Sequence, residues 1–424
     1  MTDISTRIKA WAANNTPLVF AILRTLKPNL VLKEFALITR FSDVQEALSR
    51  PDVLAVSYAE KMGMITNGGN FFLGMNDTPT YTRDVSNMRI VVRRDDVKQI
   101  VAPMVGKFAN EIVAKSNGKM EIVSELTSVV PCLFSAGYLG VPGPSREKLF
   151  EWTSSMFHYL FYPGNPKEVD DAAISNGAKT RAYLDQLVAM RKQQAESGDE
   201  KDDVIGRCLK LQKAGTPGMT DLDIRNNLIG ILIGLVPTTS KCAVLVLDYL
   251  LDHPELLAGA QQAALADDDE TLRKYMLEAL RLNSFGAGVF REATADYVIA
   301  SGSFRSKKIP KGSKILVATQ SAMLDGRELE NPKSFRLDRP DYQYMHFGFG
   351  MHTCFGQYIN MVQIPLIVKS ILRCRNLRRA AGDAGKVQYN QPFPVRFNLE
   401  FDAPRAAKTT PQDKAEAQRL SAIA

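Results

Sequence analysis

The chain has 424 residues, of which 45% are hydrophobic and 23% are charged, and its formal net charge is +7. This hydrophobic content excludes a largely disordered protein, and the length allows a core that encloses a ligand. The five cysteines are odd in number and widely scattered, which disfavours a disulfide framework and indicates a reducing compartment: Cys132, Cys208, Cys242, Cys354 and Cys374.

Two segments bear on where the protein resides. Residues 1–9 lack a charged leader followed by an apolar region, and the apolar run from Leu228 to Pro237 is about half as long as a bilayer span requires. We therefore expect a soluble, cytoplasmic protein with no membrane span. The positive charge comes without a recognition motif for nucleic acid, so we expect no nucleic-acid partner.

The composition changes little along the chain until the last residues, which are small and polar. No repeat or low-complexity tract interrupts it. This predicts a single domain over residues 1–403 and a C-terminal tail over 404–424 that is loose or forms a short helix.

Apolar residues recur with a helical period over much of the chain, which predicts a mainly α fold. The predicted helices cover residues 44–48, 97–113, 121–139, 183–191, 222–251 and 270–282. The predicted strands are few and short, at 298–300, 315–318 and 395–399. We expect the longest helix to end near Asp252, because His253-Pro254 then provides the start signal of another helix.

Glu278 and Arg281 stand three residues apart in the predicted helix 270–282, so they share a face and can form an ion pair. Taken alone, such a spacing most often marks a solvated surface pair that contributes little. Here it precedes two proline-containing segments, 309–313 and 331–340, and then a cysteine loop, and this order makes the pair more informative.

The cysteine loop extends from Phe347 to Gly356 and places Cys354 among glycines at the entry to a helical stretch. Gly350 and Gly356 supply the backbone freedom that lets amide groups point at a sulfur atom. A thiolate there gains from these amides and from the start of the following helix. The alternative is that Cys354 is an ordinary buried cysteine.

The loop has the pattern FxxGxxxCxG and, with Glu278-x-x-Arg281 upstream, resembles the cytochrome P450 family. The resemblance implies a mainly α fold with small β-sheets, in which haem b lies between a long distal helix and the cysteine loop. Cys354 is then the axial ligand of the haem iron, Gly348, Gly350 and Gly356 shape the loop, and Phe347 shields the sulfur. It also implies that Arg339 joins Glu278 and Arg281 in a structural network.

Haem carries propionates, and a buried carboxylate needs a partner. By resemblance, Arg291 and His352 are expected at the propionates. A third contact normally comes from a His-x-x-x-Arg motif, and the matching stretch begins at Tyr81. Tyr81 can still donate a hydrogen bond, whereas the position of the arginine is occupied by valine, so Arg83 or Arg89 is the candidate substitute.

The apolar stretch 228–239 resembles the distal helix of the family, whose signature is A/G-G-x-D/E-T-T. Thr238 matches the catalytic threonine, but Pro237 occupies the acidic position and Leu235 the second glycine position. In the family the acid and the threonine deliver protons during oxygen activation, and a positioned proton donor contributes roughly a hundred- to ten-thousand-fold in rate. Pro237 is also expected to kink the helix. The alternative is that Gly230, Gly234 and Pro237 only bend a buried helix.

The resemblance further suggests which residues form the walls of a substrate pocket. These residues are apolar or aromatic, which indicates a hydrophobic small-molecule substrate, although such side chains are often ordinary core: Phe72, Leu235, Phe285, Val289 and Phe393. Nothing in them separates a fatty acid from a terpenoid or an aromatic polyketide.

The expected activity is that of a bacterial-type haem-thiolate monooxygenase, a monomer that receives electrons from a ferredoxin-type donor with its reductase. The basic segment 369–379 is the candidate docking surface for the donor, with a solvated helix end as the alternative. Because Pro237 replaces the acid, two other activities stay open. One is a peroxide-dependent peroxygenase or hydroperoxide-rearranging enzyme, and the other is a non-catalytic haem or ligand binder.

Overall fold

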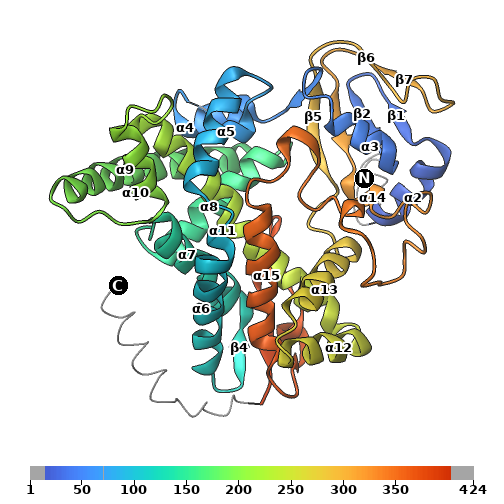
Figure 1. Cartoon of the computed structure of the whole chain (residues 1–424). Helices are drawn as coiled ribbons and strands as arrows, with labels where there is room; N and C mark the ends of the chain where they lie inside the picture. The colour runs from blue at the N-terminus through green and yellow to red at the C-terminus, as the bar shows by residue number, and fades with distance from the viewer. Residues whose placement is uncertain (1–14, 70, 403–424) are drawn as a thin grey trace.

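The computed structural model describes residues 15–69 and 71–402, so the tail expected over 404–424 lies outside the described residues. Helices make up most of the molecule, and the larger sheet gathers with short helices at one side, at the upper right of Figure 1. The expectation of a mainly α fold with small β-sheets is confirmed. The expectation of a single domain over 1–403 stays a prediction.

The helices are, in chain order, α2 (Thr16–Leu26), α3 (Phe41–Leu48), α4 (Ala59–Thr66), α5 (Pro79–Val91), α6 (Ala102–Ala114), α7 (Val129–Phe134), α8 (Arg146–Phe161), α9 (Lys167–Glu196), α10 (Val204–Lys213), α11 (Asp221–Leu251), α12 (Pro254–Leu265), α13 (Asp269–Leu282), α14 (Thr319–Ala322) and α15 (Gln357–Leu372). Three π-helical segments occur at η2 (Val97–Val101), η3 (Val123–Thr127) and η4 (Ser135–Leu139).

The strands are β1 (Asn29–Val31), β2 (Phe35–Ile38), β3 (Leu54–Val56), β4 (Lys119–Glu121), β5 (Val289–Ala293), β6 (Tyr297–Ile299), β7 (Lys307–Ile309), β8 (Lys314–Val317), β9 (Arg378–Arg379), β10 (Gln388–Asn390), β11 (Phe393–Arg396) and β12 (Asn398–Glu400). They form a five-stranded sheet in the order β1-β2-β8-β5-β3, a three-stranded sheet β4-β12-β9 and the pairs β10-β11 and β6-β7. In the largest sheet, β2 and β8 are parallel.

The long helix α11 has the boundaries that the sequence predicts. Thr220 and Asp223 form a capping box at its start, it ends at Leu251, and α12 begins at Pro254. The helix continues through Pro237. By length and composition α11 could span a bilayer, which the estimate from the shorter apolar run did not anticipate, but 78% of its most apolar window is buried in this fold.

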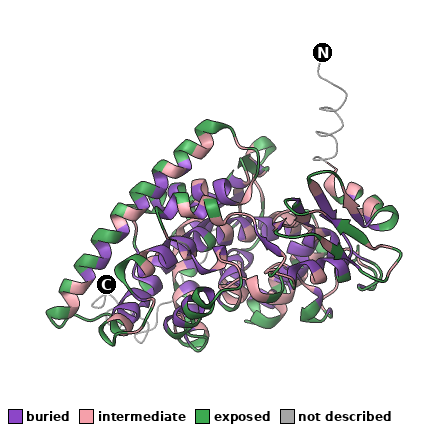
Figure 2. Cartoon of the chain, turned by 90° about the horizontal axis from the view of Figure 1, so that it is seen from above, coloured by how far each residue is buried: buried purple, intermediate pink, exposed green. Residues whose placement is uncertain are grey.

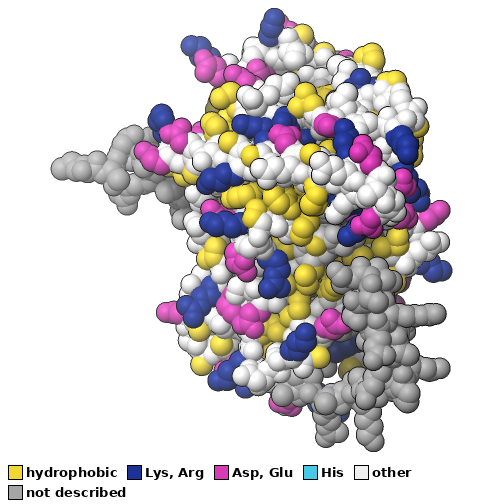
Figure 3. All heavy atoms as spheres, turned by 90° about the vertical axis from the view of Figure 1, so that its left-hand side faces the viewer, with side chains coloured by type: hydrophobic (Ala, Val, Ile, Leu, Met, Phe, Trp, Pro, Cys, Tyr) yellow, Lys and Arg dark blue, Asp and Glu magenta, His cyan; other side chains and the backbone are white. Residues whose placement is uncertain are grey.

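Buried side chains fill the space between the helices, and exposed ones cover their outer faces (Figure 2). The main hydrophobic core surrounds α11 and is lined by α6, α8, α9, α13 and α15. On the face shown in Figure 3, charged side chains of both signs are interspersed with apolar atoms. The helix α9 was predicted only over 183–191 because most of its surface is polar, and its buried residues form a narrow stripe.

Candidate functional site

The loop that carries Cys354 is folded tightly on itself. The amide of Cys354 donates a hydrogen bond to the carbonyl of Phe347 over 2.8 Å. Gly348 and Gly350 have φ values of 76° and 72°, which favour glycine. A Cβ on Gly350 would stand 2.9 Å from the carbonyl oxygen of Leu48, so this glycine also lets the loop pack against the end of α3.

The sulfur of Cys354 lies at the start of α15. Burial raises the pKa of the Cys354 thiol, and a hydrogen bond from the amide of Gly356 acts in the opposite direction. Gly356 precedes the first residue of the helix, Gln357, whose amide donates to the carbonyl of Cys354 over 3.2 Å. The pKa of the thiol stays raised overall, so the free amides and the dipole of this helix start offset only part of the cost of a negative charge on the buried sulfur.

Across from this loop, α11 presents one stripe that is not fully buried. Ile231, Gly234, Thr238 and Cys242 follow one another at helical spacing on this stripe, whereas most of their neighbours are buried. A Cβ added to Gly234 would meet nothing within 4 Å. The hydroxyl of Thr239 on α11 donates to Asn360 Oδ1 on α15 over 3.2 Å, so the helix that carries the stripe packs against the helix that begins beside Cys354. The charge of Cys354 also acts to raise the pKa of Cys242.

A third segment, residues 282–290, also consists of partly buried residues and includes the predicted wall residues Phe285 and Val289. Val289 begins β5 and pairs with Val317. The ring centroid of Phe285 lies 5.9 Å from that of Phe157 on α8. The segment, the α11 stripe and the Cys354 loop thus each carry side chains that the packed core does not cover.

Arg291 is a buried cation without a counter-ion among the described residues. Only 6% of its surface is exposed, and its guanidinium donates to the carbonyl of Phe290 over 2.9 Å. Burial lowers its pKa, and the charge of Tyr58 acts in the opposite direction. A buried guanidinium in this state favours an anionic ligand.

His352 and Tyr81 lie beside one another, with ring centroids 5.7 Å apart. The Nε2 atom of His352 is 2.7 Å from the carbonyl oxygen of Met75, and its Nδ1 atom is buried without a partner in the described structure. The hydroxyl of Tyr81 donates to the carbonyl of Met351 over 2.6 Å. Burial lowers the pKa of His352.

The two arginines suggested as substitutes for the third propionate contact have different surroundings in the structure. Arg83 is paired with Asp84 over 2.7 Å and packs against Gly218 at the loop before α11. Arg89 is exposed on α5, eight residues after Tyr81, and its charge acts to lower the pKa of the Tyr81 hydroxyl. Arg89 is therefore the better candidate.

Tyr58 belongs to this group, although the sequence analysis missed it. Burial raises the pKa of Tyr58 to about 12, and the charges of Arg291, Tyr81 and Cys354 all act on its hydroxyl. The hydroxyl donates to the carbonyl of Leu73 over 2.6 Å. No motif surrounds Tyr58 in the sequence, so only the fold could bring it to the site.

These observations agree with the requirements of a haem. The thiol at a helix start suits an iron ligand, and the buried Arg291 suits a carboxylate. The Nδ1 atom of His352 has no partner in the described structure and becomes a donor to a carboxylate when the ring is protonated, since Nε2 already faces a carbonyl. The uncovered stripe of α11 suits the face opposite the sulfur. The residues present therefore fit the group. Cys354 would ligate the iron, Arg291 and His352 would bind the propionates, and Tyr81 would join them by turning its hydroxyl away from the carbonyl of Met351.

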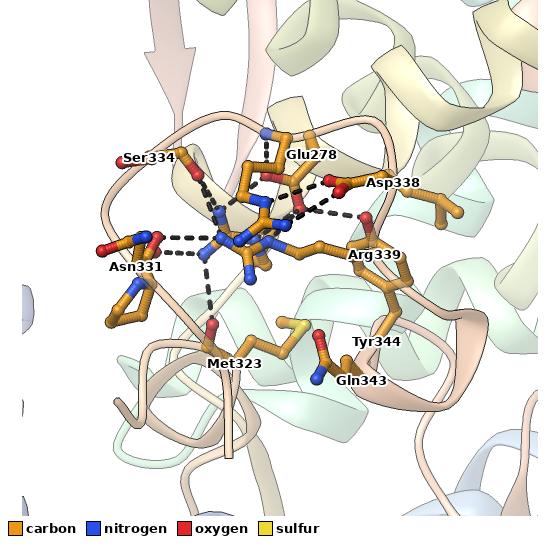
Figure 4. A network of polar contacts seen from close by, with 12 residues as sticks. Glu278, Met323, Asn331, Ser334, Asp338, Arg339, Gln343 and Tyr344 are labelled. Atoms are coloured by element: carbon orange, nitrogen blue, oxygen red, sulfur yellow. Dashed lines mark hydrogen bonds and ion pairs between the residues drawn. The ribbon is translucent and has the colours of Figure 1, made fainter. Parts of the chain in front are cut away.

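Glu278, Arg281 and Arg339 form one buried network, shown in Figure 4. Arg281 donates to both carboxylate oxygens of Glu278 over 2.6 and 2.7 Å, and both side chains are completely buried. The Nε atom of Arg339 lies 3.3 Å from Glu278. Tyr344, which the sequence analysis did not single out, donates to Glu278 over 3.0 Å.

The network joins α13 to the irregular segment that leads to the Cys354 loop. Arg281 also donates to the carbonyls of Met323 and Ser334, over 3.2 and 2.9 Å. Burial acts to raise the pKa of Glu278, but the hydrogen bonds and charge of Arg281 outweigh it and the pKa is lowered overall. The contacts support a structural role for the network.

The remaining wall residues lie in different surroundings. Phe72 is fully buried and packs edge-on against Phe355, next to Cys354, with ring centroids 4.9 Å apart. Phe393 packs against Phe157 at 5.3 Å. Leu235 is 8% exposed and lies beside the stripe of α11. Phe285 and Phe393 thus meet at one aromatic cluster, whereas Phe72 belongs to the cysteine side.

The family model described as Cytochrome P450 matches residues 145–383, which is more than half of the chain. The chain belongs to the cytochrome P450 family. The match includes the Cys354 loop, α11 and the Glu278 network, so these features are the chain's version of the P450 core. The family membership implies a haem-iron cofactor.

Individual proteins of known name resemble the chain at low identity. A bifunctional dioxygenase (DOX)-epoxy alcohol synthase (EAS) of Pyricularia oryzae is 22% identical over 402 residues, covering 85% of this chain and 34% of that protein. Abscisic acid 8'-hydroxylase 3 of Oryza sativa subsp. indica is 28% identical over 247 residues, covering 53% of this chain and 47% of that protein. The chain thus spans a third to a half of the length of these relatives.

The fold is shared with solved P450 structures. Cytochrome P450 CYP109Q5 from Chondromyces apiculatus superimposes with a TM-score of 0.74 at 20% sequence identity, covering 93% of this chain and 97% of that chain. This likeness concerns the arrangement of helices and sheets.

Proposed function

We propose that the chain is a haem-thiolate monooxygenase, which inserts one oxygen atom from dioxygen into a hydrophobic small molecule with electrons from a separate protein. One observation carries the proposal. The sulfur of Cys354 accepts a hydrogen bond from the amide of Gly356 at the start of α15. The uncovered stripe of α11, which carries Thr238, lies near this sulfur.

The residues on the two sides of the site have different roles. Bound haem supplies the oxidising chemistry. The Gly356 amide and the start of α15 hold negative charge on the Cys354 sulfur, while Arg291, His352 and Tyr81 bind the propionates. On the other side, Thr238 carries the one hydroxyl among the four residues named on the α11 stripe, and the aromatic cluster around Phe285 orients the substrate.

A second candidate is an enzyme that consumes an organic hydroperoxide, and α11 favours it. Pro237 supplies no acid, and the Thr238 hydroxyl already donates to the carbonyl of Gly234 within the helix. One relative is named as a dioxygenase joined to an epoxy alcohol synthase. A hydroperoxide and an epoxy alcohol carry the same two oxygen atoms, so converting one to the other requires no electrons from outside.

Product analysis under two conditions separates the candidates. A monooxygenase forms product with a ferredoxin, its reductase and NAD(P)H under oxygen. If product forms only from added hydroperoxide, the monooxygenase proposal fails and the second candidate holds. In the Cys354→Ser protein, the reduced carbon monoxide complex is expected to lose the long-wavelength Soret band of a thiolate-ligated haem. An unaltered spectrum in this variant rules out both candidates.

The role of Thr238 is tested by the coupling of electron use to product. A Thr238→Ala variant is expected to consume NAD(P)H with less product, because the stripe then offers no hydroxyl to hold or pass a proton. Thr80→Ala, an exposed change on α5, is the control and leaves coupling unchanged. Unchanged coupling in Thr238→Ala would remove this residue from the mechanism.

We also propose a docking surface for the electron donor, and it differs from the basic segment 369–379. In that segment Lys369 and Arg373 pair with Asp267, and Arg379 pairs with Asp248. Much of its charge is therefore compensated by acidic neighbours.

The better surface lies before α6 and at the start of α15. Arg93, Arg94 and Lys98 are exposed there and form no ion pair with a described residue. The guanidinium of Arg94 covers the ring of Tyr358 at 4.2 Å, four residues after Cys354. An acidic ferredoxin is the partner that such a basic surface close to the thiolate would steer.

A further inference from the structure

Lys241 is a buried lysine on α11 whose charge is not compensated. Its side chain lies inside the core with 6% of the residue exposed, three residues after Thr238. No hydrogen bond or ion pair joins its ammonium group to any residue in the described part of the chain. Burial lowers the pKa of Lys241 to about 8, so the group still carries a proton near neutral pH.

Aromatic rings surround this ammonium group. The Nζ atom lies 4.3 Å from the ring centroid of Phe285 and 5.9 Å from that of Phe393. Phe157 on α8 contacts both rings, at 5.9 and 5.3 Å. Two rings thus lie against the ammonium and a third packs behind them, and the two rings beside the ammonium belong to residues predicted from the sequence to line the substrate pocket.

The other buried lysine in the described part of the chain, Lys369, has the carboxylate partners that Lys241 lacks. Lys369 is also 6% exposed, but its ammonium lies 2.7 Å from Asp267 and 2.5 Å from Asp269. Ring faces attract a cation, yet this attraction is smaller than the cost of removing an ammonium group from water. The rings thus leave the charge of Lys241 without an anionic partner among residues 15–69 and 71–402.

We propose that Lys241 binds the carboxylate of the substrate, which makes the substrate a hydrophobic organic acid. Its acid group would pair with the ammonium beside α11, and its apolar part would lie along Phe157, Phe285 and Phe393. The inference rests on the proposed function, because it takes these aromatic residues to be the walls of the substrate site. It adds the chemical class of the ligand that this pocket selects.

The binding test uses the haem-loaded protein and two matched probes, dodecanoate and dodecanol, titrated by the shift of the Soret band. The intact protein is expected to bind the acid more tightly than the alcohol. In Lys241→Met the affinity for dodecanoate falls by roughly thirtyfold or more, because the carboxylate is then buried unpaired, while the affinity for dodecanol changes little. Lys241→Arg keeps the charge and retains the preference for the acid.

Lys369→Met is the matched control, because it removes a buried lysine that has its own carboxylates. It leaves the preference for dodecanoate over dodecanol unchanged. An equal loss of that preference in Lys369→Met would show a general effect of losing a buried lysine and would overturn the proposal.

Thermal unfolding without ligand gives a second, independent readout. If Lys241 serves the ligand, Lys241→Met removes an uncompensated charge and raises the unfolding temperature. If the lysine is only a structural partner of the rings, the same change lowers it and leaves the acid preference intact, and the proposal is wrong. Failure of both probes to bind would also overturn it. The proposed function is independent of these outcomes. It holds as long as the protein keeps the thiolate spectrum and forms product, whether or not Lys241 binds the acid.

Discussion

The hydroxyl of Thr239 on α11 donates a hydrogen bond to Asn360 Oδ1 on α15 over 3.2 Å, and both side chains are buried. Thr239 directly follows Thr238, and Asn360 lies six residues after Cys354. The contact therefore fixes the helix with the uncovered stripe relative to the helix that begins at the thiolate.

Removing this contact should weaken the fold without removing the thiolate. In Thr239→Val the shape is kept, but the amide oxygen of Asn360 is left buried without its donor, which typically costs about 1–3 kcal/mol. Denaturant unfolding of the haem-loaded protein measures the loss. Thr80→Val on the surface of α5 should change stability by less than about 0.5 kcal/mol. Equal stabilities of the two variants would show that the contact is not formed in solution.

Glu278→Gln should be severe, because it leaves Arg281 and Arg339 buried around a neutral side chain. Breaking a buried pair by removing one partner typically costs about 3–5 kcal/mol. Urea unfolding and the haem content of purified protein measure the effect. The exposed pair of Lys148 and Glu151, 2.9 Å apart, provides the control, and Glu151→Gln should cost at most about 1 kcal/mol. A Glu278→Gln protein that binds haem normally and is equally stable contradicts the structural role.

Binding of an acid probe should depend on pH through Lys241, whose pKa is lowered to about 8. The ammonium is charged below this value, so the dissociation constant of dodecanoate should be flat near neutral pH. It should then rise up to about tenfold per pH unit above the pKa. The neighbouring thiol of Cys242, whose pKa burial raises to about 12, stays neutral over this range. A flat profile to alkaline pH would contradict the pairing.

The lowered pKa of Lys241 also predicts how the stability of the ligand-free protein changes with pH. In the folded protein Lys241 has a pKa below its ordinary value of 10.5, so between about 8 and 10.5 the unfolded chain binds more protons. The destabilisation from burying this lysine is therefore fully present below about pH 8 and is relieved as the pH rises toward 10.5. Ligand-free Lys241→Met protein should lack this rise in stability, as measured by unfolding at several pH values.

Reversing the charge of Arg94 should slow reduction by an acidic electron donor. We expect Arg94→Glu to lower the rate of haem reduction by roughly tenfold at low salt, with the difference shrinking as salt rises. Stopped-flow reduction measures this rate. Arg378→Glu removes an arginine that already pairs with Glu400 at 3.0 Å, so it should have a smaller effect. An equal loss in both variants would place the docking surface elsewhere.

Local patterns in the sequence predicted α11, α13 and the cysteine loop. The boundaries of α11 follow from the capping residues Thr220 and Asp223 and from Pro254, which act within a few residues along the chain. Several strands were missed, among them β3 and β5, because each is only three to five residues long and is stabilised by a partner far away in sequence.

The predicted site shows the same division. Cys354, Glu278 and Arg281 belong to motifs with fixed spacing, so the sequence could name them. Tyr58 and Tyr344 carry no such pattern and reach their partners only through the fold. The basic segment 369–379 looked like a docking surface because its acidic partners lie far off in sequence, at residues such as Asp248 and Asp267.

The sequence by itself determined the kind of fold and the position of the Cys354 loop, because helix periodicity, capping and glycine spacing are local properties of the chain. The tertiary structure decided which charges are compensated. Lys241 and Lys369 are both lysines in apolar helices, and only long-range packing gives one of them two aspartates and the other two aromatic rings. The burial of an unpaired charge is a property of the folded chain, since it depends on every element that excludes water from that point.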